Sequence, residues 1–178
     1  PFKVICREWK LDSLLAELAV HRLDLVLSDR PLPADMSVHA FNHRLGGSSV
    51  GFYASKAIAS KLKKGFPACL DGAPLLAPAS DSALGMRLGQ WLGGHKLKPH
   101  LIGEFDDSAL PMALGHLGHG VFMAPMVLDA AMQAQYGVKR LGEATDLIES
   151  YYVIPVERRL THPGVVAITQ AAREGLFA

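Results

Sequence analysis

The sequence predicts an α/β fold, because short apolar strands alternate with amphipathic helices along most of its 178 residues. Repeated strand–helix units indicate a mostly parallel sheet, since parallel strands need a crossover connection between them. Hydrophobic residues make up 49% and charged residues 20%, which is the balance of a folded globular protein. The length allows one sizeable core or two small lobes.

The N-terminal part predicts a strand, a helix and a second strand. Residues 2–6 form a short apolar, β-branched stretch, and Asp12 follows as a candidate helix cap. The predicted helix has one apolar stripe, made of Leu14, Leu15, Leu18 and Ala19. Leu23–Leu27 is a nearly continuous apolar run, the pattern of a parallel strand covered on both faces.

Two extended segments follow, Val38–Phe41 and Val50–Tyr53, and we place a crossing between lobes here, with a flexible turn at residues 46–49. A strand is expected next at residues 75–77, followed by a helix that Ser80 or Asp81 caps and that Gly93 and Gly94 stop. A second strand is expected at 101–105. The helix after it would be capped by Asp106 or Asp107 and would bury Leu110, Ala113, Leu114 and Leu117. The chain then predicts strand 121–124, helix 125–136, which Gly137 stops, and strand 138–141. An irregular segment at 143–150 leads to strand 151–156. The last helix would begin at His162 and Pro163 and would bury Val165, Val166, Thr169, Ala172 and Leu176.

The charge balance excludes a strong overall attraction to nucleic acid or to an anionic membrane. Lys and Arg number 18 against 17 Asp and Glu. The one basic cluster has no interleaved aromatic residues, so we interpret it as solvated surface. Its members are Lys56, Lys61, Lys63 and Lys64.

The cysteines and the lack of a long apolar run predict a cytoplasmic protein. Cys6 and Cys69 are far apart, so we expect free, mostly buried thiols in a reducing compartment. No run approaches the roughly 18 apolar residues of a membrane span, and residues 1–3 lack the pattern of a signal peptide. We expect no membrane association. A start at Pro1 without Met indicates that an upstream segment was removed.

Three motif searches give no catalytic or metal site. His116 and His119 lie around a glycine-rich helix end, where a metal would lack a fixed scaffold. Ser80 follows a strand but lacks the flanking glycines of a nucleophile elbow. The glycines at 115, 118 and 120 reverse the order of a dinucleotide fingerprint. We therefore expect no metal, no cofactor and no enzymatic activity.

Small polar residues follow three of the predicted strands. They lie at Ser28–Arg30, Ser80–Ser82 and Phe105–Asp107. In open α/β sheets, ligands bind beyond the carboxyl ends of strands, where backbone N–H groups point toward them. For Ser82 and Asp107, helix capping is as good an interpretation as ligand contact.

Three segments, in this order and spacing, resemble the effector-binding domain of LysR-type transcription regulators. The first combines Leu14–Leu18 with the run RLDLVLSD at Arg22–Asp29. The second is GHGVFMAP at Gly118–Pro125, and the third is RLTHPGV at Arg159–Val165. The resemblance covers nearly the whole chain.

Three further segments resemble, more narrowly, the branch of this family that regulates sodium/proton antiporter genes. They are Phe66–Leu70, Gly103–Leu110 and Pro155–Arg159. The branch implies sodium or pH as the input, sensed through Asp29 and Glu8, because hard cations prefer oxygen ligands. Ordinary ion pairs of these carboxylates with Arg30 or Lys10 are the alternative.

The family resemblance implies two Rossmann-like lobes joined by two crossing strands, as in type 2 periplasmic binding proteins. Residues 1–46 and 151–178 would form lobe I, without its first strand and helix, and residues 47–150 would form lobe II. The resemblance also implies homodimers with lobes packed head to tail. DNA would be bound through an N-terminal helix-turn-helix domain that is not in this chain, in a full-length activator that forms tetramers.

A small-molecule or ion effector would bind in the cleft between the lobes and shift the DNA-bound tetramer between states by lobe closure or dimer rearrangement. Carried over position by position, the effector-binding residues are Glu8, Trp9, Leu11, Ser28, Asp29, Arg30, Ala79, Ser80, Asp81, Ser82, Phe105 and Met123. Two other classes share this fold: the solute-binding protein of a transporter, and a small enzyme.

Overall fold

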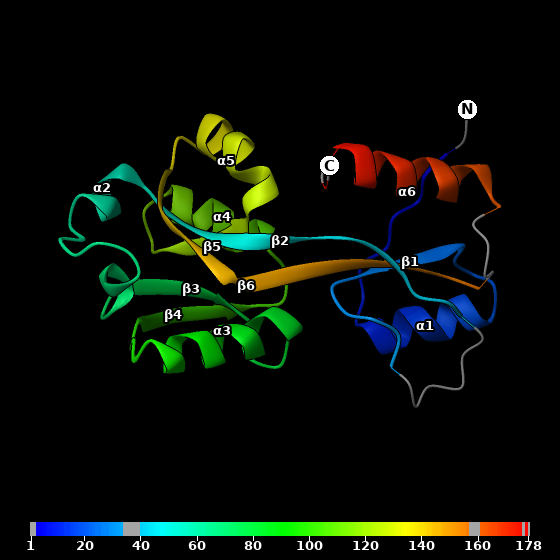
Figure 1. Cartoon of the computed structure of the whole chain (residues 1–178), viewed down its shortest axis with the longest axis horizontal. Helices are drawn as coiled ribbons and strands as arrows, with labels where there is room; N and C mark the ends of the chain where they lie inside the picture. Colours follow the sequence, from blue (N-terminus) through cyan, green and yellow to red (C-terminus); the bar gives the residue numbers. More distant parts are fainter. Residues whose placement is uncertain (1–2, 34–39, 157–160, 176, 178) are drawn as a thin grey trace. The chain divides into compact units, whose positions relative to one another are not determined.

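The computed structural model describes residues 3–33, 40–156, 161–175 and 177 (Figure 1). Parts of three predicted elements, at Phe2, Val38 and Leu176, lie outside these ranges. The chain forms two compact units, one made of Pro1–Gly47 with Ser150–Ala178 and the other of Ser48–Glu149. Within the described ranges, no helix has the length and hydrophobicity needed to cross a membrane.

The first unit has one edge strand between two helices. Helix α1 (Leu11–Ala19), strand β1 (Leu25–Ser28) and helix α6 (Pro163–Gly175) belong to it, together with the end of strand β6 (Lys139–Pro155). Strand β1 pairs antiparallel with β6, from Leu25 opposite Pro155 to Ser28 opposite Tyr152. Helices α1 and α6 lie on opposite sides of β1 (Figure 1). The core of this unit contains Leu11, Leu15, Leu18, Val26 and Ile154.

Several N-terminal predictions were wrong. Residues 3–7 form no strand, and Cys6 is exposed rather than buried. Helix α1 begins after Lys10 without a side-chain cap, and Asp12 lies in its first turn. Strand β1 begins at Leu25 and runs antiparallel, at one end of its sheet. A short run of apolar residues does not distinguish an edge strand from a central one, because both contribute a buried face.

Strands β2 (His43–Ala54) and β6 each pass from one unit into the other. The turn predicted at residues 46–49 and the irregular segment predicted at 143–150 are therefore wrong, since both lie inside these strands. The polar side chains of Ser48 and Ser49 have hydrogen-bond partners that lie far away in the sequence. Ser49 Oγ donates a hydrogen bond to the Glu143 carboxylate (2.5 Å), and Ser48 Oγ accepts one from the Val127 N–H (3.2 Å).

The described strands form a four-stranded and a two-stranded sheet, so the expectation of one mostly parallel sheet was wrong. The four-stranded sheet has the order β1-β6-β2-β5, in which β1 runs antiparallel to β6 and β5 (Phe122–Pro125) runs antiparallel to β2. The two-stranded sheet pairs β3 (Pro74–Pro78) in parallel with β4 (His100–Phe105). The helices of this second unit are α2 (Lys56–Ala59), η1 (Ala68–Leu70), α3 (Ala83–Gly94), α4 (Ala109–His116), η2 (Met126–Leu128) and α5 (Asp129–Tyr136).

Three aromatic rings hold the larger core of the second unit. The ring of Phe52 on β2 lies 5.5 Å from those of Phe66 and Trp91, which are 5.9 Å apart. The indole N–H of Trp91 donates to the Asp146 carboxylate on β6 (2.8 Å). The rings contribute apolar burial, and the hydrogen bond satisfies the one polar group of the indole.

The ends of the helices follow the predicted chemistry with shifts of a few residues. Ser82, rather than Ser80 or Asp81, caps α3 by accepting from the Gly85 N–H (2.9 Å). Helix α3 ends at Gly94, which confirms the stop predicted at Gly93 and Gly94. Helix α5 ends at Gly137, whose φ of 60° confirms the predicted stop.

The predicted buried face of α4 was wrong, because Leu110 and Leu117 are exposed. The helix instead buries Pro111, Met112 and Gly115. A Cβ at Gly115 would overlap the ring of Phe122, so the glycine lets this face approach β5 closely. Asp107 accepts a hydrogen bond from the Leu110 N–H (2.9 Å), which confirms its predicted capping role.

A buried tyrosine joins β2 to α5. The Tyr53 hydroxyl donates to Asp129 (2.9 Å), and Arg140 forms a 3.0 Å ion pair with the same carboxylate. Burial, and then the hydrogen bond to Asp129, raises the pKa of Tyr53 well above its usual range.

We expect the protein to lose stability above about pH 10, where a tyrosine in the unfolded chain ionises. Because the folded state keeps the Tyr53 proton, its stabilising contribution is complete below that pH and falls as the pH rises further. Urea unfolding between pH 8 and 11 measures this loss. Tyr53→Phe should make the alkaline decline shallower, and an unchanged slope would contradict the assignment.

Gly85→Ala and Gly89→Ala on α3 should have opposite effects. A Cβ at Gly85 would overlap the Ala79 carbonyl oxygen, whereas a Cβ at Gly89 meets nothing within 4 Å. We expect Gly85→Ala to lower the free energy of unfolding by about 1–3 kcal/mol through overpacking. Gly89→Ala should raise it by about 0.5–1 kcal/mol through helix propensity. Equal effects in urea unfolding would show that the packing at Gly85 is incorrect.

Candidate functional site

The carboxyl ends of the parallel strands β3 and β4 meet at one edge of the second unit. The Ala79 N–H donates to the Phe105 carbonyl (2.8 Å), and the Ser80 N–H donates to the Glu104 carboxylate (3.1 Å). The structure therefore brings Ala79, Ser80 and Phe105 together, although they lie far apart in sequence. Sequence reasoning missed Glu104, whose only signal is its place at the end of a predicted strand.

Helix α3 begins directly after these strand ends. The Ser82 hydroxyl is engaged in capping this helix, while Ser80 and Asp81 are exposed. The first turn of a helix presents backbone N–H groups and a partial positive charge, which suit an anionic or hydrogen-bond-accepting ligand. Asp81 adds a negative charge next to this turn, so it would favour a ligand with hydrogen-bond donors or a cation.

Two of the predicted site residues are buried in the cores. Met123 on β5 belongs to the core that contains Phe52 and Trp91, and Leu11 packs with Leu15 in the first unit. These side chains hold the strands and helices in place. Their direct contact with an effector stays a prediction.

The other predicted residues of the first unit lie at the end of β1 and before α1. The Ser28 hydroxyl accepts a hydrogen bond from the Arg30 N–H (3.2 Å), which shapes the turn after the strand. Trp9 is exposed, with the Arg7 guanidinium 5.5 Å from its ring centroid.

The two acidic residues of this set do not form ordinary ion pairs with their basic neighbours. Among the described side chains, Glu8 and Asp29 make no salt bridge with Arg30 or Lys10. Glu8 is exposed and Asp29 is half-buried. Both carboxylates are therefore available to a cation or to a donor group of a ligand.

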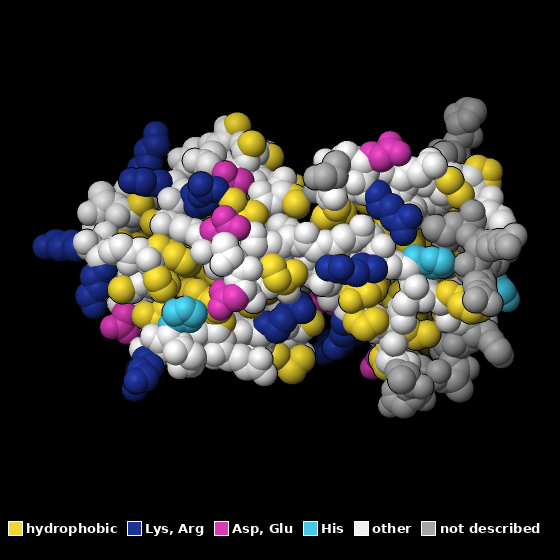
Figure 2. All heavy atoms as spheres, in the orientation of Figure 1, with side chains coloured by type: hydrophobic (Ala, Val, Ile, Leu, Met, Phe, Trp, Pro, Cys, Tyr) yellow, Lys and Arg dark blue, Asp and Glu magenta, His cyan; other side chains and the backbone are white. Residues whose placement is uncertain are grey.

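The described ranges contain no group of three or more His, Cys, Asp or Glu side chains placed to hold a metal ion. Nδ1 of His116 instead bonds to the Tyr136 carbonyl oxygen, which links the end of α4 to the end of α5. Lys and Arg side chains are spread over the visible face rather than gathered into a patch (Figure 2).

The sequence is similar to a bacterial transcription activator over its whole length. It is 33% identical to the transcriptional activator protein NhaR of Escherichia coli strain K12 over 178 residues, and equally identical to NhaR of Shigella flexneri. The match covers 100% of this chain but 58% of each relative, so the chain spans little more than half the length of these proteins. No family model matches the chain.

Solved structures of LysR-type regulators have the same fold. The Vibrio fischeri regulator DarR in complex with DNA gives a TM-score of 0.70 at 16% identity, covering 94% of this chain and 56% of that one. The effector-binding domain of QuiR with shikimate gives 0.66 at 12% identity, covering 94% and 78%. The predicted α/β class, with two lobes joined by crossing strands as in type 2 periplasmic binding proteins, is confirmed. The chain therefore has the fold of the effector-binding domain of LysR-type regulators, and its sequence is similar to that of the activator NhaR over its whole length.

Proposed function

We propose that this chain is the effector-sensing and oligomerisation domain of a DNA-binding transcription activator. The observation that carries the proposal is the 33% identity to NhaR across the full 178 residues. The chain spans 58% of that relative, so DNA binding would belong to a part of the full-length protein outside these residues. The likeness to DarR, which was solved in complex with DNA, also supports a separate DNA-binding part in the full-length protein.

The effector would contact polar groups at the ends of β1, β3 and β4. Ser28, Asp29 and Arg30 would contribute from the first unit, and Ala79–Ser82 with Phe105 from the second. Glu8 and Trp9 would add a carboxylate and an aromatic surface, and Leu11 and Met123 would add apolar side chains. The position of these residues after strands supports this choice, because ligands of open α/β sheets bind beyond the carboxyl ends of the strands.

Effector binding would stabilise one arrangement of the full-length homotetramer on DNA over another. Such a shift requires that the effector bind the two arrangements with different affinities. The proposal uses no catalytic residue and no cofactor, and it places the protein in the cytoplasm, where it meets DNA. The absence of a metal-binding group within the described ranges is compatible with it.

DNA footprinting with the full-length protein tests the proposed function. We expect protection of discrete sites upstream of regulated genes, and a transcription reporter from such a site should depend on the protein. Ser28→Ala and Ser80→Ala should abolish the reporter response to the inducing condition while the footprint remains. Ser13→Ala, an exposed serine on α1, is the matched control and should respond normally. Uniform weak protection of all DNA would contradict the proposal.

Sodium is a second, narrower candidate for the input, supported by the similarity to NhaR and by the carboxylates of Glu8 and Asp29, which form no salt bridge among the described side chains. Oxygen ligands suit a hard cation. If the protein regulates sodium/proton antiporter genes, sodium sensing would link the expression of these genes to the sodium concentration.

The sodium candidate predicts that the full-length protein responds to sodium but not to potassium at the same ionic strength. The unfolding temperature or the footprint should change with sodium chloride, and Asp29→Asn should remove the change. Asp12→Asn, an exposed carboxylate on α1, is the control and should retain it. Identical titrations with the two salts would eliminate sodium as the input and leave the transcriptional role intact.

A further inference from the structure

One end of the second unit holds most of the lysines of the chain. Six of the nine lysines lie in two short segments, residues 55–72 and 95–100. Asp71 is the one acidic residue that these segments contain. The six lysines, which form the basic rim, are all exposed: Lys56, Lys61, Lys63, Lys64, Lys96 and Lys98.

The fold brings the two segments together, although β3 and α3 separate them in the sequence. The Asp71 carboxylate joins them, because it accepts a hydrogen bond from the Lys98 N–H (3.1 Å) and lies 3.9 Å from Lys64 Nζ. The Gly72 N–H also donates to the Lys98 carbonyl oxygen (3.0 Å). The lysines of both segments therefore belong to one surface, which their spacing in the sequence does not reveal.

Core packing turns these lysines toward solvent. Apolar residues that alternate with them pack against the larger core of the second unit, namely Ile58, Leu62, Phe66, Leu92 and Leu97. Dark-blue side chains accordingly stand along the left edge of Figure 2, where α2 lies, as a rim rather than one compact patch.

Lys96 occupies a position that favours a different residue. Its φ is 55°, in the left-handed region that glycine adopts without strain. The Lys96 N–H donates to the Gly93 carbonyl oxygen (3.1 Å), a bond that any residue other than proline could make, and the side chain is exposed. The local backbone therefore gains nothing from a lysine here, whereas the surface gains a positive charge.

The composition of the basic rim fits a phosphate backbone better than a protein. Lysine ammonium groups act as point charges toward phosphates. A protein partner would need apolar or aromatic anchors, yet none of the large hydrophobic residues exposed in the described ranges lies in the two segments. The segments also contain no arginine, the side chain that reads bases most often. The rim therefore suits contact that is independent of nucleic-acid sequence.

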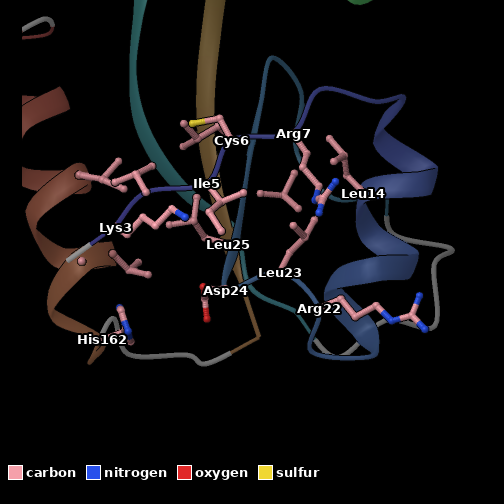
Figure 3. Close-up of a pocket in the computed structure, with 16 residues that line it drawn as sticks. Lys3, Ile5, Cys6, Arg7, Leu14, Arg22, Leu23, Asp24, Leu25 and His162 are labelled. Carbon is pink, nitrogen blue, oxygen red and sulfur yellow. The ribbon is translucent and has the colours of Figure 1, made fainter.

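Cations of the first unit are arranged differently. Lys3, Arg7 and Arg22 line a pocket of about 400 Å³ in that unit, and Asp24 lines it as well (Figure 3). Arg22 also forms an ion pair with Glu17 (3.4 Å). Positive charge there has acidic neighbours, so it attracts a polyanion less than the basic rim does.

We propose that the basic rim contacts the DNA phosphate backbone beside the site that the full-length protein recognises. This inference rests on the proposed function, because another part of the full-length protein would hold DNA near this chain. The rim adds affinity for DNA and no preference for its sequence.

Salt titrations with two lengths of DNA test the proposal. The full-length protein is bound to its footprinted site alone, and to the same site extended at each end by two helical turns, about 20 base pairs. The logarithm of the binding constant falls with the logarithm of the salt concentration, with a slope of about 0.9 for each phosphate neutralised. We expect a steeper slope on the longer DNA, because only that DNA reaches the rim.

Lysine substitutions provide matched variants. Lys61→Gln with Lys63→Gln should reduce the slope on the longer DNA by about 2 and leave the shorter DNA unaffected. Lys3→Gln with Lys10→Gln removes the same charge from exposed positions of the first unit and should change neither slope. Lys96→Gly should reduce the slope on the longer DNA by about 1 without lowering the unfolding temperature, because its φ suits glycine.

Three results would overturn the proposal. Equal slopes on the two DNA lengths, or equal effects of the two double variants, would show that the rim does not contact DNA. Loss of the transcription reporter response with unchanged slopes would assign the rim to an acidic protein partner instead. Failure of the unsubstituted protein to bind either DNA would overturn the proposed function as well, whereas the first two results would leave that function intact.

Discussion

Strands β2 and β6 are hydrogen-bonded neighbours, and each contributes residues to both compact units. On β6, Ala144 and Leu147 are buried in the second unit, while Ile154 is buried in the first. On β2, Phe52 stacks in the second unit, while the Arg44 carbonyl accepts a hydrogen bond from Arg173 in the first (3.2 Å). Neither core is complete without these strands, so loss of their pairing would weaken both.

The strands also determine where functional groups can be placed. Strand β6 pairs with β1 and so positions Ser28 at the end of the edge strand. Strand β2 pairs with β5, and Val121, just before β5, forms a parallel bridge to Leu75 of β3 that orients the ends of β3 and β4. The polar groups proposed to contact an effector therefore lie on loops that rigid strands support, an arrangement typical of binding sites.

Sequence patterns predicted the α/β class, most helices and the capping chemistry, because apolar periodicity and residues such as Asp107 and Gly137 act locally. They failed where distant segments decide. Ser48 and Ser49 have the composition of a turn, yet Val127 and Glu143 satisfy them inside a strand. The polarity of residues 143–150 likewise hid a long strand. In the candidate site, Ser80 and Phe105 were found from their places after strands, whereas the role of Glu104 required the β3–β4 register.

Hydrogen exchange of the full-length protein across residues 46–49 and 143–150 tests most directly whether β2 and β6 run unbroken between the units. If they do, amides in both segments should exchange at least about 100-fold more slowly than in an unfolded chain. Exchange at the unfolded rate in either segment would show two lobes joined by flexible linkers, and would contradict the dependence of both cores on these two strands.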